Sequence, residues 1–288
     1  MSRVYIVTDS AAAIEPAVAG RLGVTVVPLI VRIDHQIYRN GADLGHEELL
    51  LRMTRDRACP QVVGPTAEQF QRVYARLIRY TDQIISLHSS AGLSLVCREA
   101  RIAAREFLGR CDILVVDSET LSLGLSILVK EAARWARESV SLGEIVRQVR
   151  GMIRRIYIVL VTDTLDYLEY SRLISPAQAI LGAMLGIRPF LAIEEGRIIP
   201  MEKVRSRERA IDKLAEFANE FSDIERVAIL QSTPYPTSKT KALRERLELI
   251  APGHELPILL YGPLLASHIG PDGIGLVVYE GKPKEILP

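Results

Sequence analysis

The feature that most constrains the fold is a regular alternation, in the first half of the chain, between short strand-like runs and segments of helical period. Three such runs are Val4–Val7, Gln83–His88 and Asp112–Val116. Small polar residues follow each run, and a helical stretch follows those. Strands that alternate with helices predict a parallel sheet covered by helices. We therefore expect an α/β fold whose N-terminal domain holds a doubly wound, mainly parallel sheet.

The second half of the chain has a different rhythm. Arg188–Pro200 reads as a hairpin with a Glu-Gly turn, Ser206–Phe221 as an amphipathic helix, and Gly275–Tyr279 as a last strand. This mixture predicts a C-terminal mixed α/β domain with antiparallel strands. We place the domain boundary near residue 156, so that residues 1–156 and 157–288 form two domains with a ligand cleft between them.

Local signals define several further elements. Thr66 with Gln69 predicts a capping box at the start of a helix. Ser175 with Pro176 predicts another helix start, because serine caps well and proline suits the first helical position. The remaining expectations are a helix over Ala11–Leu22, one strand over Val24–Val31 with an edge position or a break at Pro28, a loop over Cys59–Pro65, and a helix over Ala177–Leu185.

Composition narrows the functional class. The 288 residues include 36 basic and 35 acidic ones, a net charge of +1, which does not suit a nucleic-acid-binding surface. The apolar runs are too short to span a membrane. The three cysteines are an odd number without a CxxC pair, and the N-terminus turns polar too quickly for a signal peptide. We expect a cytoplasmic protein.

Motifs for cofactor chemistry are absent from the sequence. There is no Walker motif and no GxGxxG after a strand, so nucleotide binding has no support. No GxSxG elbow marks a hydrolase serine, and the five histidines show no HExxH spacing. Asp9, Asp117 and Asp163 end strands and could hold magnesium, although helix capping is the favoured role. We expect no cofactor and no metal.

Polar residues at three strand ends form the first candidate site. These are Asp9 with Ser10, Ser89 and Ser90 with Ser94, and Asp117 with Ser118. Ligands of parallel sheets bind beyond the carboxyl ends of the strands, so these residues can share a pocket. The alternative for each is a helix cap, a role that serine and aspartate also favour.

A second candidate site lies near the end of the chain. His268 precedes a turn, Gly270–Gly273, whose glycines and proline permit positive φ and close backbone approach. The segment supplies a bend, several N–H groups and a titratable ring, a combination suited to gripping a carboxylate. A purely structural turn and histidine are the alternative.

Several motifs, taken in order, resemble the DegV family over nearly the whole chain. They are Ile6–Ser10, Val26–Leu29, Tyr38–Asp43, Asp163–Leu168, Ile174–Ser175, Arg188–Pro189, Lys203–Arg205 and His268–Pro271. The resemblance implies two α/β domains that hold one long-chain fatty acid in an apolar tunnel. Hydroxyl groups and a histidine grip the carboxylate, and some members present the acid to a separate ATP-dependent fatty acid kinase.

The head-group pattern carries over unevenly. Ser94 and His268 match the family's contacts, and Gly270, Gly273 and Arg205 keep their places, with Arg205 a candidate for docking the kinase. The residues that follow Ser94 are leucine and valine where the family has glycine and threonine. Val62 stands where the family has a threonine, so the hydroxyl is lost. Either Gln61, Ser90 or backbone N–H groups compensate, or the ligand head differs from a plain carboxylate.

The resemblance implies a binding protein without catalysis of its own. The helix over Ile174–Leu185 offers the tunnel an apolar wall, although most of its side chains are expected in the core. The alternative from another class is a hydrolase or acyl-transfer enzyme with Ser94 as nucleophile and His268 as base. A third possibility is a partner surface that has lost its ligand.

Overall fold

The computed structural model describes residues 3–33 and 35–281. The chain divides into two compact units. The first contains the residues up to Arg154, together with Glu195–Arg197 and Gly262–Ser267. The second contains Arg155–Glu194, Ile198–Tyr261 and the residues from His268 onward. Two short segments from the second half of the sequence therefore belong to the first unit, which no local sequence signal indicates.

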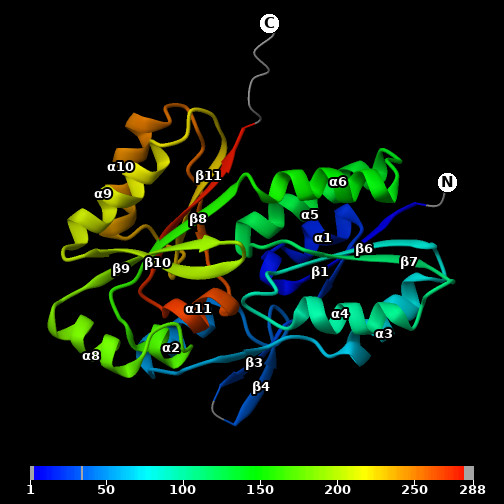
Figure 1. Ribbon diagram of the computed structural model, residues 1–288, viewed down its shortest axis with the longest axis horizontal. Coiled ribbons are helices and arrows are strands. Elements are labelled where there is room, and N and C mark those ends of the chain that lie inside the picture. Colours follow the sequence, from blue (N-terminus) through cyan, green and yellow to red (C-terminus); the bar gives the residue numbers. More distant parts are fainter. Residues whose placement is uncertain (1–2, 34, 282–288) are drawn as a thin grey trace, which may run out of the picture. The chain divides into compact units, whose positions relative to one another are not determined.

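The first unit is built on a parallel four-stranded sheet, as expected. Its strands lie in the order β2-β1-β6-β7, with every neighbouring pair parallel. Helices lie on both faces of this sheet, α5 and α6 on one and α3 and α4 on the other (Figure 1). The elements are β1 Tyr5–Asp9, α1 Pro16–Leu22, β2 Val24–Val27, α3 Ala67–Leu77, β6 Gln83–His88, α4 Val96–Arg105, β7 Asp112–Asp117, α5 Ser122–Arg137 and α6 Leu142–Ile153.

A small antiparallel sheet, in the order β4-β3-β5, also belongs to this unit. Its strands are β3 Ile30–Ile33, β4 Gln36–Arg39 and β5 Gln61–Val63, and helix α2 is His46–Arg55. The break considered at Pro28 is confirmed and the single strand over Val24–Val31 is wrong, since the chain leaves the parallel sheet after Val27 and enters this one at Ile30. Pro28 lacks an N–H for the ladder. The loop expected over Cys59–Pro65 is also wrong, because β5 pairs with β3.

The helix expected over Ala11–Leu22 is interrupted. Ser10–Ala12 forms a short 3-10 turn, and Ala13 then adopts a left-handed conformation with φ of 50°. That conformation ends any right-handed helix. Helix α1 begins only at Pro16, which suits the first helical position because it has no N–H to satisfy. The capping box of Thr66 and Gln69 is confirmed at the start of α3.

The second unit is built on a mixed six-stranded sheet in the order β10-β9-β8-β13-β11-β12. Strand β13 runs antiparallel to both β8 and β11, whereas β12 runs parallel to β11. The strands are β8 Ile156–Val161, β9 Arg188–Glu194, β10 Arg197–Val204, β11 Ile224–Gln231, β12 Ile258–Leu260 and β13 Ile274–Glu280. Glu195 and Gly196 between β9 and β10 both have positive φ, the conformation of a type I′ hairpin turn.

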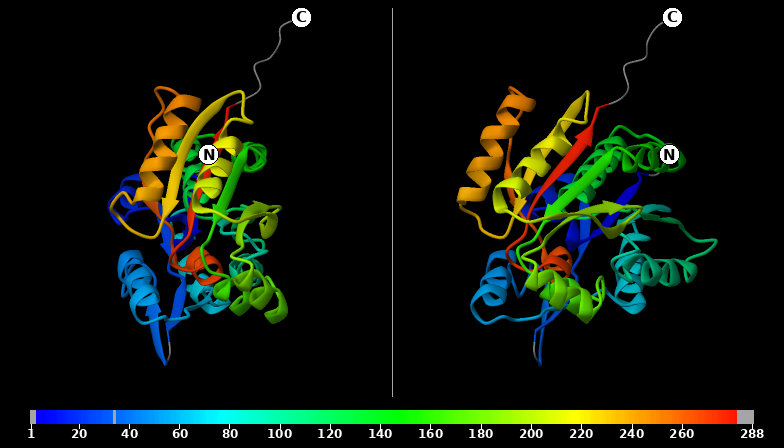
Figure 2. Two further views of the ribbon diagram at one scale, coloured as in Figure 1. Left: turned by 90° about the vertical axis from the view of Figure 1, so that its left-hand side faces the viewer. Right: turned by 60° about the vertical axis from the view of Figure 1, so that its left-hand side comes forward.

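Helices of the second unit cover this sheet and its ends. They are α7 Asp166–Tyr170, α8 Pro176–Met184, α9 Arg207–Ala218 and α10 Ser238–Ile250. Helices α9 and α10 lie side by side (Figure 2) and bury Leu214, Leu243 and Leu247 in an apolar core with strands β11 and β13. Helix α11, Pro263–Ile269, was not expected from the sequence. No helix of the described residues has the length and apolar character needed to cross a membrane.

Candidate functional site

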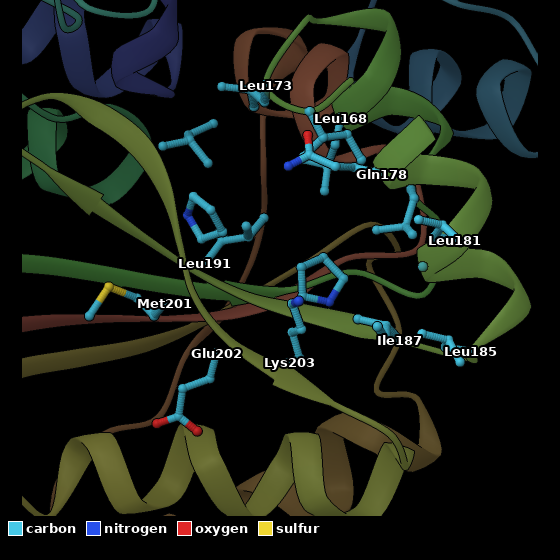
Figure 3. Close-up of a pocket in the computed structure, with 16 residues that line it drawn as sticks. Leu168, Leu173, Gln178, Leu181, Leu185, Ile187, Leu191, Met201, Glu202 and Lys203 are labelled. Carbon is cyan, nitrogen blue, oxygen red and sulfur yellow. The ribbon is translucent and has the colours of Figure 1, made fainter. Parts of the chain in front are cut away.

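A largely apolar cavity of about 690 Å³ lies within the second unit. Its walls come from α7, α8, β9 and β10, and the side chains shown in Figure 3 include Leu168, Leu181, Leu185, Ile187 and Leu191. Small-molecule pockets in proteins have volumes of roughly 300–1,000 Å³ and mostly apolar linings. The cavity is therefore suited in size and lining to an elongated apolar ligand.

Two sequence features position α8 beside this cavity: a capped N-terminus and a glycine at a close contact. The expected start is confirmed: Ser175 caps the helix in a capping box with Gln178, and Pro176 follows it. Gly182 faces Leu165, and a Cβ at this position would overlap the Leu165 Cδ1 atom. The absence of a side chain therefore lets the helix approach closely.

The expectation that most apolar side chains of α8 lie in the core is wrong. Leu181 and Leu185 line the cavity, but Ile180 and Met184 are 61% and 79% exposed. Sequence reasoning also missed the walls supplied by α7, β9 and β10. Their apolar residues read equally well as ordinary core positions, so no local signal distinguished them.

A few polar side chains also line the cavity, at separate places on its wall (Figure 3). The side chains of Gln178, Glu202 and Lys203 line it (Figure 3). Glu202 is paired with Lys213, with Lys213 Nζ 3.1 Å from Glu202 Oε2. The lining thus combines a long apolar wall with a few polar groups, which suits an amphipathic molecule.

Asp163, directly after β8, lies among three cations. Its carboxylate accepts hydrogen bonds from Arg188 Nε and Lys239 Nζ, both at 2.8 Å, and Arg207 is 3.3 Å away. Burial acts to raise the pKa of Asp163, but the bonds from Lys239 and Arg188 and the nearby charges outweigh it and lower the pKa. Asp163 is neither a helix cap nor part of a metal site, the two roles considered from the sequence. It ties β9, α9 and α10 to the end of β8.

The turn that follows His268 is held by buried aromatic side chains of the second unit. Tyr261 is fully buried, and its hydroxyl donates to Gly270 O at 2.8 Å and accepts from Gly273 N at 3.2 Å. Gly270 has φ of +82°, and a Cβ there would lie 2.5 Å from the Tyr167 ring. The glycine is thus required for both conformation and space, and His268 lies half-buried at the end of α11.

Asp9 organises the polar sheet edge in the first unit. Its carboxylate accepts from Ala11 N and Ser89 N at 2.9 and 2.8 Å, and His88 Nδ1 lies 3.1 Å from it. The capping role favoured for Asp9 is confirmed. Asp117, at the end of the neighbouring strand, accepts from Ala91 N. The three polar strand ends do lie at one edge, but these two carboxylates are occupied by main-chain N–H groups.

His88 extends this network into the core. Its Nε2 lies 2.6 Å from Ser86 Oγ, which lies 2.7 Å from the hydroxyl of Tyr74. Asp9, His88 and Ser86 thus follow the acid–imidazole–hydroxyl order of a hydrolase triad. All of them, and Tyr74, are fully buried, so no substrate can reach Ser86. The network stabilises the sheet.

The candidate serines differ in how firmly they are held. Ser90 Oγ donates to Gly196 O at 2.6 Å and accepts from Gly92 N, so it ties its own loop to the turn between β9 and β10. Ser10 Oγ accepts from Leu29 N and from the Asn40 amide. Ser94 is half-buried, and its hydroxyl makes only long contacts, 3.3 Å to Ser90 O and 3.4 Å to Ser89 Oγ. Of these hydroxyls, that of Ser94 is the least constrained.

The remaining candidates are placed as follows. Gln61 and Val62 lie on β5, where they pair with Arg32 and Val31 of β3. Arg205 is exposed between β10 and α9, and its carbonyl accepts from Arg188 Nη1 at 3.1 Å. Ser94 belongs to the first unit and His268 to the second. Their joint grip on a head group, the part of Gln61 and Val62 in it, and docking at Arg205 stay predictions.

Residues that could hold a metal ion are not gathered in the described ranges. Over residues 3–33 and 35–281, no group of three or more histidine, cysteine, aspartate or glutamate side chains is arranged as a metal site.

Residues 3–281 match the family model described as uncharacterised proteins of the DegV family. The chain belongs to the DegV family. A DegV domain-containing protein of Deinococcus radiodurans is 32% identical over 96% of this chain and 98% of its own length. Another, of Streptomyces coelicolor, is 33% identical over 96% of this chain and 99% of its own.

Solved structures of DegV proteins share this fold. A DegV family protein from Thermus thermophilus, described as binding fatty acid, is 31% identical, with a TM-score of 0.82 over 97% of this chain and 100% of that one. One from Streptococcus agalactiae, at 24% identity, has a TM-score of 0.86 over 98% of this chain and 100% of that one, which shows the common fold. The resemblance stated from the sequence motifs is confirmed.

Proposed function

We propose that this protein binds one long-chain fatty acid, or a similar lipid, without catalysing a reaction on it. The observation that carries the proposal is the 690 Å³ cavity with its wall of leucine and isoleucine side chains. The acyl tail occupies this cavity, and Ser94 and His268 hold the carboxylate. The Thermus thermophilus relative described as fatty acid binding supports the same ligand class.

Energetics favour a ligand held mainly by its tail. Burial of each CH₂ group contributes about 0.8 kcal/mol, so a long saturated tail supplies most of the affinity. A carboxylate that loses one hydrogen bond, as at Val62, forfeits about 1–3 kcal/mol. Several buried methylenes offset that loss, so fatty acid binding tolerates the altered head-group pattern.

We further propose that the bound acid is presented in the cytoplasm to a separate ATP-dependent fatty acid kinase that docks near Arg205. The absence of a phosphate-binding loop in the sequence supports a division of labour in which the partner supplies the nucleotide chemistry. The cysteines Cys59, Cys97 and Cys111 are not joined in disulfides, which suits a reducing compartment.

Ligand extraction and cavity variants test the binding proposal. Organic extraction of the purified protein, followed by mass spectrometry, is expected to release a stoichiometric fatty acid. Gly182→Val pushes Leu165 toward the cavity and is expected to weaken binding of hexadecanoic acid severalfold. Ala183→Val is the matched control, because Ala183 is exposed on the same helix and does not line the cavity. An empty protein that also ignores added fatty acids contradicts the proposal.

Two side-chain variants test the head-group contacts and the enzymatic alternative together. Ser94→Ala and His268→Ala are each expected to weaken hexadecanoic acid binding, whereas Ser139→Ala, on an exposed turn, is not. The hydrolase alternative instead predicts that a serine-reactive fluorophosphonate labels Ser94 and that labelling requires His268. Labelling of this kind, with turnover of an ester substrate, contradicts passive binding.

A further inference from the structure

The turn after His268 has a second anchor besides Tyr261. Thr162, directly after β8, is buried, and its Oγ1 lies 2.8 Å from Ile269 O and 3.0 Å from Asp272 Oδ1. Ile269 follows His268 in the sequence, so the Thr162 hydroxyl fixes the main chain directly beside the residue that carries the imidazole. Thr162, Ile269 and Asp272 all belong to the second unit.

A proton count shows that this contact depends on the state of Asp272. A threonine hydroxyl has one proton to donate, and both a carbonyl oxygen and an ionised carboxylate only accept. With Asp272 ionised, Ile269 O and Asp272 Oδ1 compete for that one proton, so neither contact has it to itself. With Asp272 protonated, its hydroxyl donates to Thr162 Oγ1, and Thr162 donates to Ile269 O. The neutral acid therefore gives each of the two contacts a hydrogen of its own.

Charged and titratable groups around Asp272 also affect its protonation state. Asp163 carries a negative charge nearby, and its carboxylate takes up Arg188, Arg207 and Lys239. Lys239 Nζ also lies 3.4 Å from the main-chain oxygen of Asp272.

The phenol of Tyr261 also interacts electrostatically with Asp272, and its hydroxyl donates a hydrogen bond to Gly270 O in the turn. Burial raises the pKa of Asp272. The charge of Asp163 acts in the same direction, whereas a hydrogen bond from Thr162, one from the backbone N–H of Asp272 and the charge of Lys239 act to lower the pKa. The direction of the net shift agrees with the proton count.

We propose that Asp272 is a neutral carboxylic acid which, through Thr162, locks the main chain beside His268, so that its ionisation loosens the turn and weakens the grip of His268 on a ligand carboxylate. Asp272 and Thr162 are positioning residues. The effect on the ligand rests on the function proposed above, whereas the protonated acid and its bond to Thr162 do not. Binding is strongest below the pH at which Asp272 ionises and weakens as the pH rises through it.

Titration of the ligand-free protein tests the lock directly. Carbon-13 NMR of the aspartate carboxyl groups, with Asp272 assigned by comparison with Asp272→Asn, is expected to give a midpoint above the ordinary value of 3.8. Thr162→Val removes the hydroxyl and is expected to move this midpoint. A midpoint at or below 3.8 in the native protein overturns the proposal, whether or not the protein binds lipid.

Binding of hexadecanoic acid across the same pH range tests the consequence. Above the Asp272 midpoint, the native protein is expected to bind about fivefold more weakly than Asp272→Asn, the change that corresponds to one neutral hydrogen bond. Below the midpoint the two should bind alike, because the asparagine amide also donates to Thr162. The comparison cancels the titration of the fatty acid itself.

Thr162 variants separate positioning from simple structural damage. Thr162→Val is expected to bind about fivefold more weakly at low pH, and Thr162→Ser, which keeps the hydroxyl, to restore binding. Asp112→Asn, an exposed aspartate of the first unit, is the control and should follow the native pH profile. A ratio of native to Asp272→Asn affinity that stays flat through the midpoint overturns the coupling. Absence of binding in every variant contradicts the proposed function instead. The NMR titration then still tests whether Asp272 is protonated and bonded to Thr162.

Discussion

The carboxylate of Asp9 accepts a hydrogen bond at 2.8 Å from the backbone N–H of Ser89, a residue 80 positions away. The same carboxylate accepts from Ala11 N. One buried side chain therefore fixes the loops that leave β1 and β6, including the loop that carries Ser94. The shape of this sheet edge depends on Asp9 more than on any of the serines near it.

Removal of this carboxylate is expected to destabilise the first unit strongly. Asp9→Ala leaves two buried N–H groups and the His88 ring without their partner, at about 1–3 kcal/mol each. We expect the free energy of unfolding to fall by at least about 3 kcal/mol. The single tryptophan, Trp135 in α5, reports on this unit in urea titrations followed by fluorescence. Asp112→Ala, at an exposed position, should change stability by less than about 0.5 kcal/mol. Equal effects of the two variants would contradict the role of Asp9.

Two glycines with the same φ allow the cost of a left-handed backbone to be measured separately from the cost of a steric clash. Gly270 and Gly253 both have φ of +82°, but only Gly270 faces another side chain, the ring of Tyr167. Gly253→Ala is expected to cost about 1–2 kcal/mol from the left-handed conformation alone. Gly270→Ala should cost clearly more, because the ring or the turn must move. Thermal unfolding of both variants by circular dichroism measures the difference, and similar losses would show that the Tyr167 contact is unimportant.

The ion cluster around Asp163 predicts a pH-dependent contribution to stability. The folded protein lowers the pKa of Asp163, so its stabilisation is fully present above the unfolded-state value of 3.8 and is lost as the pH falls through the folded value. Asp163→Asn is expected to lower stability by at least about 1 kcal/mol near neutral pH. The deficit relative to the native protein should shrink in acid. Urea unfolding at several pH values checks this, with Asp112→Asn as control. A deficit that does not depend on pH would count against the charge interaction.

Chain length of the ligand offers a measurement of the cavity itself. Each CH₂ added to a saturated fatty acid is expected to lower Kd about fourfold, from about 0.8 kcal/mol of burial per methylene. The gain should stop once the tail fills the cavity. Calorimetric titration with the series from decanoic to octadecanoic acid checks the slope and the plateau. Gly182→Val should move the plateau to a shorter chain, whereas Ala183→Val should not. Affinities that do not vary with length would exclude tail burial as the main contribution.

Much of the fold could be predicted because its signals are local. The parallel sheet follows from apolar runs such as Gln83–His88, and the start of α8 follows from Ser175 and Pro176. Failures came where tertiary pairing overrode a local pattern. Gln61–Val63 has no strand signal among prolines and glycine, yet it pairs with β3. The run Val24–Val31 is apolar throughout, yet its two halves belong to different sheets.

The sequence by itself determined the α/β class, the membership of the DegV family, the caps and the glycine-dependent turn at Gly270. The caps and the positive φ at Gly270 depend on residues within a few positions, and the class and the family follow from the order of such local patterns along the chain. Only the tertiary structure decided that α7, α8, β9 and β10 enclose a cavity, that Asp163 gathers three cations, and that one hydroxyl of Thr162 lies between Ile269 and Asp272. Those features depend on contacts between residues distant in sequence. Their burial and their hydrogen bonds exist only after the chain has folded.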